Sequence, residues 1–213
     1  MTARIPRHIK IGLIVLGIGF VITSGLFVNV IGRIQSLMVQ DREGQQNPFE
    51  PRSQPLYAES DPPMQVKLFF PSVQGETILS VEEQSIFRSA ELTNRAKQIV
   101  QKLLEGPRTL DLYPSIPKDT KLFEIFIDDS GLAYVDFSDT LAANHPGGMV
   151  NELATVYSIV NSLTYNLPEI RQVRILVGGA EKETLAGHCL LLPLEMDLSL
   201  TDASPPEQLA HAN

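Results

Sequence analysis

An uncharged apolar run near the start of the chain constrains its fold more than any other feature. From Ile11 to Ile31 the sequence reads IGLIVLGIGFVITSGLFVNVI. In a helix this run extends over about 31 Å, enough to cross a hydrocarbon core of about 30 Å. Because the interior of a bilayer cannot satisfy backbone N–H and C=O groups, the run must be helical there. We therefore expect a transmembrane helix over residues 11–32.

The residues around this run predict its orientation and its fate. Three basic side chains precede it, Arg4, Arg7 and Lys10, whereas the basic residues that follow are accompanied by acidic ones. This bias places residues 1–10 in the cytoplasm and the rest of the chain outside. The apolar region of a cleaved signal peptide is normally about 7 to 15 residues long and ends at small residues. This run is longer and lacks both such a site and a cysteine for lipid attachment, so we expect an uncleaved single-pass anchor in inner-membrane lipid.

Two polar segments flank the part of the chain that could form a core. Residues 33–64 are rich in proline and charge, which favours extended geometry and predicts a semi-rigid linker. Residues 201–213 are predicted to be a disordered tail. The stretch between them, 65–200, has the size of one domain. The net charge of −8 argues against sequence-independent nucleic-acid binding, because phosphate would repel the chain. Cys189, the single cysteine, cannot form an internal disulfide.

Hydrophobic periodicity predicts the order β-β-α-β-β-α-β-β in this domain. The expected strands are 65–70, 77–81, 121–128, 132–137, 173–177 and 189–194. An amphipathic helix is expected between Ser89 and Gly106, and a second helix over 148–166. The predicted fold class is α/β of the α+β type. We expect a mostly antiparallel sheet with two helices on one face.

Several segments, in order, resemble one known family. They are GPRTLDLYPSIPKDTKL, AYVDFS, NHPGGMVNELATVYSIVNSLTYNLPEI, VRILVGG and TLAGH. Together they are similar to the GerMN domain, a family named for sporulation and spore-germination proteins. The resemblance implies a small α/β module on the outer side of the cytoplasmic membrane that has no established catalytic activity. It also implies a role in the cell envelope or in assembly. Lipid-anchored members of the family carry a modified cysteine, whereas this chain has the apolar run.

A few residues could form a pocket or a functional loop. A histidine before a glycine-rich helix start, His145 with Gly147 and Gly148, could bind an anion or could simply form a turn. Asp136 lies inside a predicted strand and could act as a catalytic carboxylate or make a structural hydrogen bond. His188 and Cys189 could bind a metal together with His145, but the spacing matches no zinc pattern and a buried apolar cysteine is the preferred interpretation.

The second helix has a polar but uncharged stripe. Its residues, at i, i+4, i+7 and i+11, are Asn151, Thr155, Ser158 and Ser162. Interface cores are depleted of charge, so this stripe is a candidate partner-binding face. The alternative is a face that lies over a loop of the domain itself.

These patterns predict a non-catalytic binding or scaffolding module of the cell envelope, with no cofactor and no metal. Its expected partner is an envelope protein or a second copy of the chain. The alternative is a hydrolase or a glycan-binding module that acts on peptidoglycan. Convergence of Asp136, Glu152 and His188 in one pocket would indicate such an enzyme.

Overall fold

The computed structural model describes residues 55–73 and 77–206, which all belong to one unit of the chain, Pro51–Asn213. The predicted cytoplasmic segment 1–10, the predicted transmembrane helix 11–32 and most of the predicted linker lie outside these residues. Within the described ranges, no helix combines the length and apolarity needed to cross a bilayer. All of the described residues therefore come after the apolar run in the sequence.

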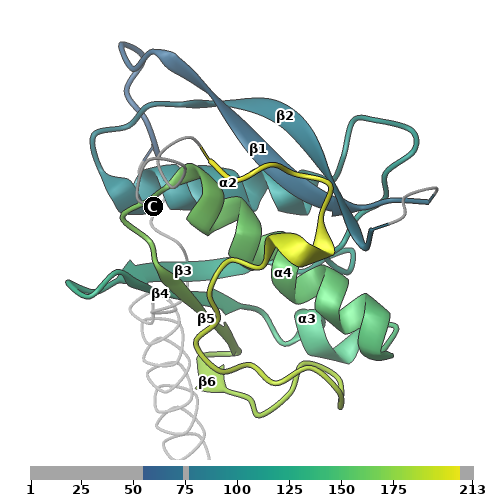
Figure 1. The fold of residues 1–213 in the computed structure, drawn as a ribbon. Helices are drawn as coiled ribbons and strands as arrows, with labels where there is room; N and C mark the ends of the chain where they lie inside the picture. Colours follow the sequence, from purple (N-terminus) through teal and green to yellow (C-terminus); the bar gives the residue numbers. More distant parts are fainter. Residues whose placement is uncertain (1–54, 74–76, 207–213) are drawn as a thin grey trace, which may run out of the picture. The chain divides into compact units, whose positions relative to one another are not determined.

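Two β-sheets lie on opposite sides of a layer of helices (Figure 1). The first sheet is an antiparallel hairpin of β1 (Pro63–Pro71) and β2 (Leu79–Phe87). The second sheet has the strand order β3-β4-β5-β6. Its strands are β3 (Leu122–Ile127), β4 (Leu132–Phe137), β5 (Gln172–Val177) and β6 (Ala180–Glu181).

The expected single sheet with two helices on one face is wrong, because the described strands form two sheets. The mixed α/β class is confirmed, and the pairing is mostly antiparallel with one exception. β4 and β5 pair in parallel, with Val135 opposite Ile175. A long helix connects these two strands, and a strand–helix–strand crossover returns the chain in the same direction. The predicted last strand, 189–194, forms only isolated bridges in the described residues, such as that between Val173 and Leu194.

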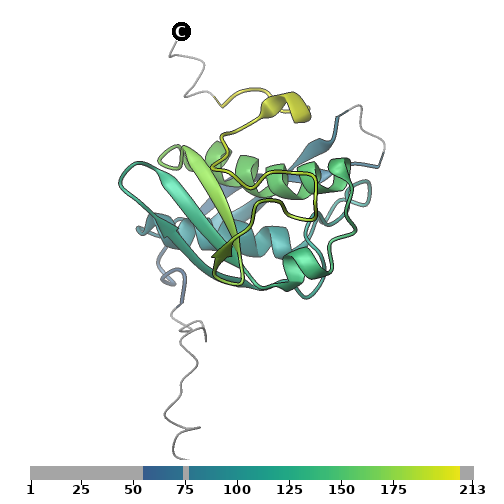
Figure 2. The same cartoon turned by 90° about the horizontal axis from the view of Figure 1, so that it is seen from below.

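The helices between the sheets are α2 (Leu92–Glu105) and α4 (Met149–Asn166), and a short α3 (Thr140–Ala143) precedes α4. α2 buries the predicted apolar face and ends at Gly106, whose φ of +84° suits a glycine. Figure 2 shows α2 and α4 beside the second sheet from below. The main core is therefore filled from three layers. Its central residues include Leu68, Phe70, Ile99, Leu103, Val135, Phe137, Ile159 and Ile175.

The globular part extends beyond both predicted boundaries. At the end of the predicted linker, the ring of Tyr57 stacks on Phe87 with 4.0 Å between the ring centroids. At the start of the predicted tail, a 3-10 turn, η1 (Leu198–Leu200), leads to Thr201, which bridges to Leu79. These contacts join residues of the predicted semi-rigid linker and of the predicted disordered tail to the domain. The rest of the predicted tail, 207–213, lies outside the described residues.

Buried polar side chains of α4 satisfy the free edge of β1. Ser162 Oγ accepts the backbone N–H of Phe69 at 3.1 Å, and Ser158 Oγ donates to the carbonyl of the same residue at 2.5 Å. Further along the strand, Asn166 accepts the N–H of Lys67 at 2.8 Å and donates to its carbonyl at 2.7 Å. α4 thus makes with side chains the hydrogen bonds that a third strand would make with its backbone.

The predicted docking face is therefore wrong for three of its four residues. Thr155, Ser158 and Ser162 are 2%, 0% and 0% exposed, whereas Asn151 is exposed. Thr155 donates to the carbonyl of Ser115 at 2.5 Å, so this part of the stripe covers a loop of the same domain. The stripe lacks charge because it faces protein, where an unpaired charge would be costly.

The edge contacts predict a large effect from a small deletion. Replacing Ser162 by Ala leaves the buried N–H of Phe69 without its acceptor, which should lower the free energy of unfolding by about 1–3 kcal/mol. Urea denaturation of the purified chain measures this change. Ser85→Ala, at an exposed position on β2, is the matched control and should change stability by less than about 0.5 kcal/mol. Equal effects of the two substitutions would contradict this account of the edge.

Candidate functional site

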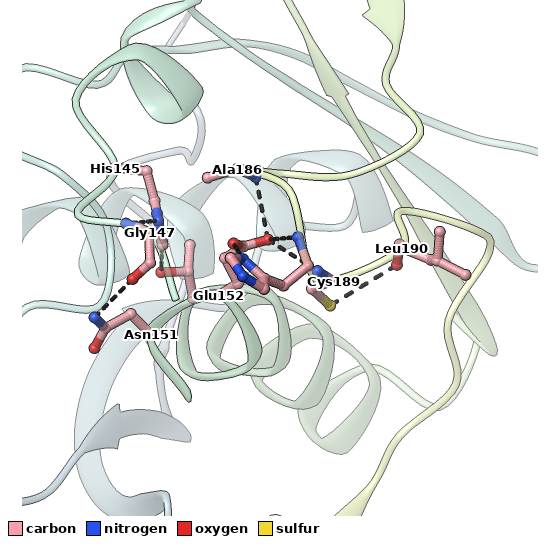
Figure 3. Close-up of polar contacts among 9 residues, drawn as sticks. His145, Gly147, Asn151, Glu152, Ala186, Cys189 and Leu190 are labelled. Carbon is pink, nitrogen blue, oxygen red and sulfur yellow. Dashed lines mark hydrogen bonds and ion pairs between the residues drawn. The ribbon is translucent and has the colours of Figure 1, made fainter. Parts of the chain in front are cut away.

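Most of the predicted pocket residues meet at the N-terminal end of α4. His145, Gly147 and Gly148 form the segment that leads into the helix, and His188 lies on the segment that follows β6. Figure 3 shows these two segments on either side of Glu152. Asp136 lies elsewhere: it is on β4, is 8% exposed and accepts the backbone N–H of Gly179 at 2.9 Å. Asp136 could have been a catalytic carboxylate or the acceptor of a structural hydrogen bond, and the structure shows the hydrogen bond.

Glu152 is the centre of this arrangement. Its side chain is fully buried in the first turn of α4, where the helix dipole favours a carboxylate. Oε2 accepts the backbone N–H groups of Ala186, His188 and Cys189 at 3.1, 3.0 and 2.9 Å (Figure 3). Oε1 lies 2.8 Å from Nδ1 of His188. The carboxylate therefore fastens a loop from the end of the domain to the start of a helix.

These contacts hold Glu152 ionised. Burial alone would raise the pKa of this carboxyl, because it removes water from the charged form. The N–H of Cys189, the His188 ring and the N–H groups of His188 and Ala186 outweigh burial and lower the pKa from 4.5 to about 2. Near neutral pH, Glu152 is therefore a permanent negative charge and not a proton donor.

The sequence points to Glu152 only as one of three residues, with Asp136 and His188, whose convergence would indicate an enzyme. Glu152 and His188 do meet, but Asp136 is bonded elsewhere. A signal for Glu152 existed: it is the single acidic residue in a helix whose other polar residues are neutral, and it falls in the first turn. Its partners could not be found in the same way, because they are backbone groups of a loop 34 to 37 residues away.

His145 is bonded through both ring nitrogens. The backbone N–H of Gly147 donates to Nδ1 at 3.0 Å, and Nε2 lies 2.9 Å from Oγ1 of Thr155. Burial lowers the pKa of His145, and the negative charge of Glu152 opposes this effect in part. The ring therefore stays neutral to lower pH than an ordinary histidine. Of the two interpretations of the histidine–glycine segment, this geometry matches turn formation.

A hollow of about 180 Å³ lies beside the His145 segment. Its lining comes from the end of β1, the 113–117 segment, Pro146 and the first turns of α4. The residues are Pro71, Tyr113, Pro114, Ser115, Ile116, Pro117, Pro146, Asn151, Ala154 and Thr155. Neither Glu152 nor His188 is among them. The pair formed by Glu152 and His188 therefore lies outside the lining of the apolar hollow.

Cys189 does not have the surroundings of a reactive thiol. Its side chain is 7% exposed, and Sγ lies 3.9 Å from the carbonyl of Leu190 (Figure 3). Burial raises the pKa of the thiol, and the charge of Glu152 raises it further. Within residues 55–73 and 77–206, no three His, Cys, Asp or Glu side chains gather in a way that could hold a metal ion.

Glu152→Gln should destabilise the domain in a pH-dependent way. The folded-state pKa lies below the unfolded one, so the carboxylate contributes its full stability above about pH 4.5 and loses it as the pH falls towards 2. A drop from 4.5 to about 2 corresponds to about 3 kcal/mol. We expect this loss at pH 7, with the difference from wild type shrinking below pH 4.5, in urea denaturation across pH.

The exposed Glu183 gives the matched control for this substitution. Glu183→Gln removes the same charge without touching the loop contacts, so its stability should stay within about 0.5 kcal/mol of wild type. A Glu152→Gln variant as stable as Glu183→Gln at pH 7 would show that the buried carboxylate does not fasten the loop.

Comparison with known proteins connects this fold to a family. A family model described as "Germane: Sporulation and spore germination" matches residues 67–183. No curated protein matches the chain. Similar solved structures include the tandem GerMN domains of the sporulation protein GerM from Bacillus subtilis. That structure is 19% identical, with a TM-score of 0.50, and the match covers 63% of this chain and 46% of that one. This likeness supports the fold.

Two further structures are similar over nearly their whole length. The first GerMN domain of the same Bacillus subtilis protein is 20% identical, with a TM-score of 0.48 over 64% of this chain and 98% of that chain. A putative lipoprotein from Clostridium perfringens is 25% identical, with a TM-score of 0.46 over 65% and 92%. The family model covers more than half of the chain and confirms the resemblance seen in the sequence. The chain belongs to the Germane family, the family of sporulation and spore germination, through a GerMN domain.

Proposed function

We propose that this chain is a membrane-tethered module that binds or scaffolds other components of the cell envelope and catalyses no reaction. The observation that supports the proposal is the set of hydrogen bonds that Glu152 makes. Its carboxylate is bonded to three backbone N–H groups and one imidazole, all of the same loop. A general acid or base works best with a pKa near the working pH, and a pKa of about 2 is far from it.

The other chemical groups of the site support the same proposal. The ring of His145 is occupied at both nitrogens, and the thiol of Cys189 is buried with a raised pKa. These groups hold loops of the domain in place and so define its surface. A surface held in this way suits recognition, because little order has to be gained when a partner binds.

The proposed location follows from the sequence. Residues 11–32 would anchor the chain in inner-membrane lipid, with 1–10 in the cytoplasm and the domain outside. The proposed partner is an envelope protein or a second copy of the chain, and the net charge of −8 argues against nucleic acid. Peptidoglycan is a further candidate ligand.

One observation favours peptidoglycan or another glycan as the second candidate. Phe126 and Tyr134 lie side by side on neighbouring strands of the second sheet, with 6.2 Å between the ring centroids. Phe126 is 62% exposed. Adjacent rings can form a platform for the apolar faces of sugars. Binding of purified peptidoglycan in a pelleting assay that Phe126→Ser abolishes would favour this candidate.

The tether is tested by the fate of the N-terminus. We expect membrane fractions of the native cells to hold a full-length chain that protease degrades from the outer side of intact spheroplasts. N-terminal sequencing checks that the chain is uncleaved, and high-salt washing checks that it stays in the membrane. A mature chain that starts after Gly32, or one that is soluble without detergent, would overturn the tether.

The scaffolding role is tested by crosslinking in intact envelopes. The full chain should give defined crosslinked products, and a matched control of residues 1–64 fused to an unrelated domain should lose them. Products that the two chains share would assign the contacts to the anchor and contradict a role for the domain.

A further inference from the structure

His145 joins three segments through a fixed pattern of protons. The backbone N–H of Gly147 can only donate, so Nδ1 must offer a lone pair to it at 3.0 Å. The hydroxyl proton of Thr155 is directed to the carbonyl of Ser115 at 2.5 Å. Oγ1 of Thr155 is therefore the acceptor at 2.9 Å, and the proton of the ring lies on Nε2. This chain of bonds requires neutral His145.

Protonation of the ring breaks this pattern at one point. A second proton can only go to Nδ1, where it would face the N–H of Gly147. Two donors then oppose each other, while the Nε2 contact to Thr155 remains possible in geometry. Gly147 would keep only the exposed contact from Asn151 Nδ2 to its carbonyl at 2.9 Å, whereas Gly148 still accepts the N–H of Glu152 at 3.0 Å. His145 must therefore turn away or release Gly147.

The same segment contributes one residue to the lining of the hollow. Pro146 lines it together with the 113–117 segment, which Thr155 holds through Ser115. The proline lies between His145, which titrates, and Gly147, which loses its contact. Release of Gly147 would therefore let Pro146 move and widen the hollow.

The charged groups around His145 do not replace the hydrogen bond between Nδ1 and the N–H of Gly147. On α4, the negative charge of Glu152 favours the protonated ring, and so does the backbone of Asn151. The 113–117 segment contributes Tyr113 as its titratable residue, and α3 contributes none. Asp139, before α3, lies against Gly178, where a Cβ would meet its carboxylate at 2.6 Å. Burial lowers the pKa of His145 in spite of Glu152, which places the release below the ordinary titration of histidine.

The loop on the other side of α4 is held in a different way. Nδ1 of His188 lies 2.8 Å from Oε1 of Glu152. Three backbone N–H groups of the same loop remain bonded to Oε2 at any pH at which Glu152 is ionised. These three bonds do not depend on the protonation of a histidine.

We propose that His145 is an acid-operated latch: its protonation releases the N–H of Gly147 and opens the hollow beside it, while Glu152 keeps the loop 186–189 in place. The latch belongs to the domain itself and does not depend on the proposed tether or on any partner. Because neutral His145 favours the closed form, the latch stabilises the domain fully above about pH 6.5 and loses this contribution as the pH falls below it.

Hydrogen–deuterium exchange of the full chain in mild detergent tests the latch. After correction for intrinsic exchange, the protection of the Gly147 amide within residues 144–148 should fall about fivefold or more between pH 7.5 and pH 5, the change expected for one lost hydrogen bond. Residues 186–189 should keep their protection. Equal protection of residues 144–148 at the two pH values would overturn the latch.

Two substitutions separate the two histidines. His145→Asn places a non-titrating oxygen near the position of Nδ1, so residues 144–148 should show no pH dependence. His188→Asn, the matched control, should leave the pH dependence of that segment as in wild type. A pH dependence that persists in His145→Asn would overturn the proposal.

A measurement on the wild-type chain covers the case in which His145→Asn does not fold. The imidazole carbon resonance of His145 should titrate below pH 6.5 with the same midpoint as the loss of protection at residues 144–148. A midpoint at or above 6.5, or two midpoints that differ, would overturn the latch.

Discussion

The burial of α4 between two sheets is the constraint on which the rest of the structure depends. A helix on the surface can solvate its polar side chains, but this one is covered by β1 on one side and by β5 on the other. Each buried polar group must therefore find a partner within the domain. Ser158, Ser162 and Asn166 find theirs along the edge of β1, and Asn161 bonds the backbone of Asp197 in both directions.

The same constraint produces the candidate site. At its N-terminal end α4 buries a carboxylate, and Glu152 recruits a loop that follows the second sheet. One turn away, Thr155 links His145 to Ser115 and so joins two more segments. The helix thus collects three loops at one end through hydrogen bonds. Two of the side chains that hold this end of the domain are the histidines His145 and His188.

Local elements of the fold could be predicted because their signals are local. The apolar face of α2, the glycine at its end and the β3–β4 turn, where Asp128 accepts the N–H of Ser130 at 2.9 Å, all depend on neighbouring residues. The division into two sheets could not be predicted, because strand pairing depends on contacts between distant segments. The prediction that the polar stripe of α4 binds a partner was wrong for a related reason. An interface core and a buried helix face are both depleted of charge, so the sequence pattern does not distinguish them.

By itself, the sequence determined the family, the succession of most helices and strands, and an apolar run long enough to span a bilayer. These follow from composition and periodicity, which operate over a few turns of chain. Only the tertiary structure decided that the stripe of α4 faces inward, that Asp136 is bonded to Gly179 and that Glu152 and His145 hold separate loops. The physical reason is that a polar side chain can hydrogen-bond to many different groups. Only the packing of the folded chain decides which of these groups lies within reach.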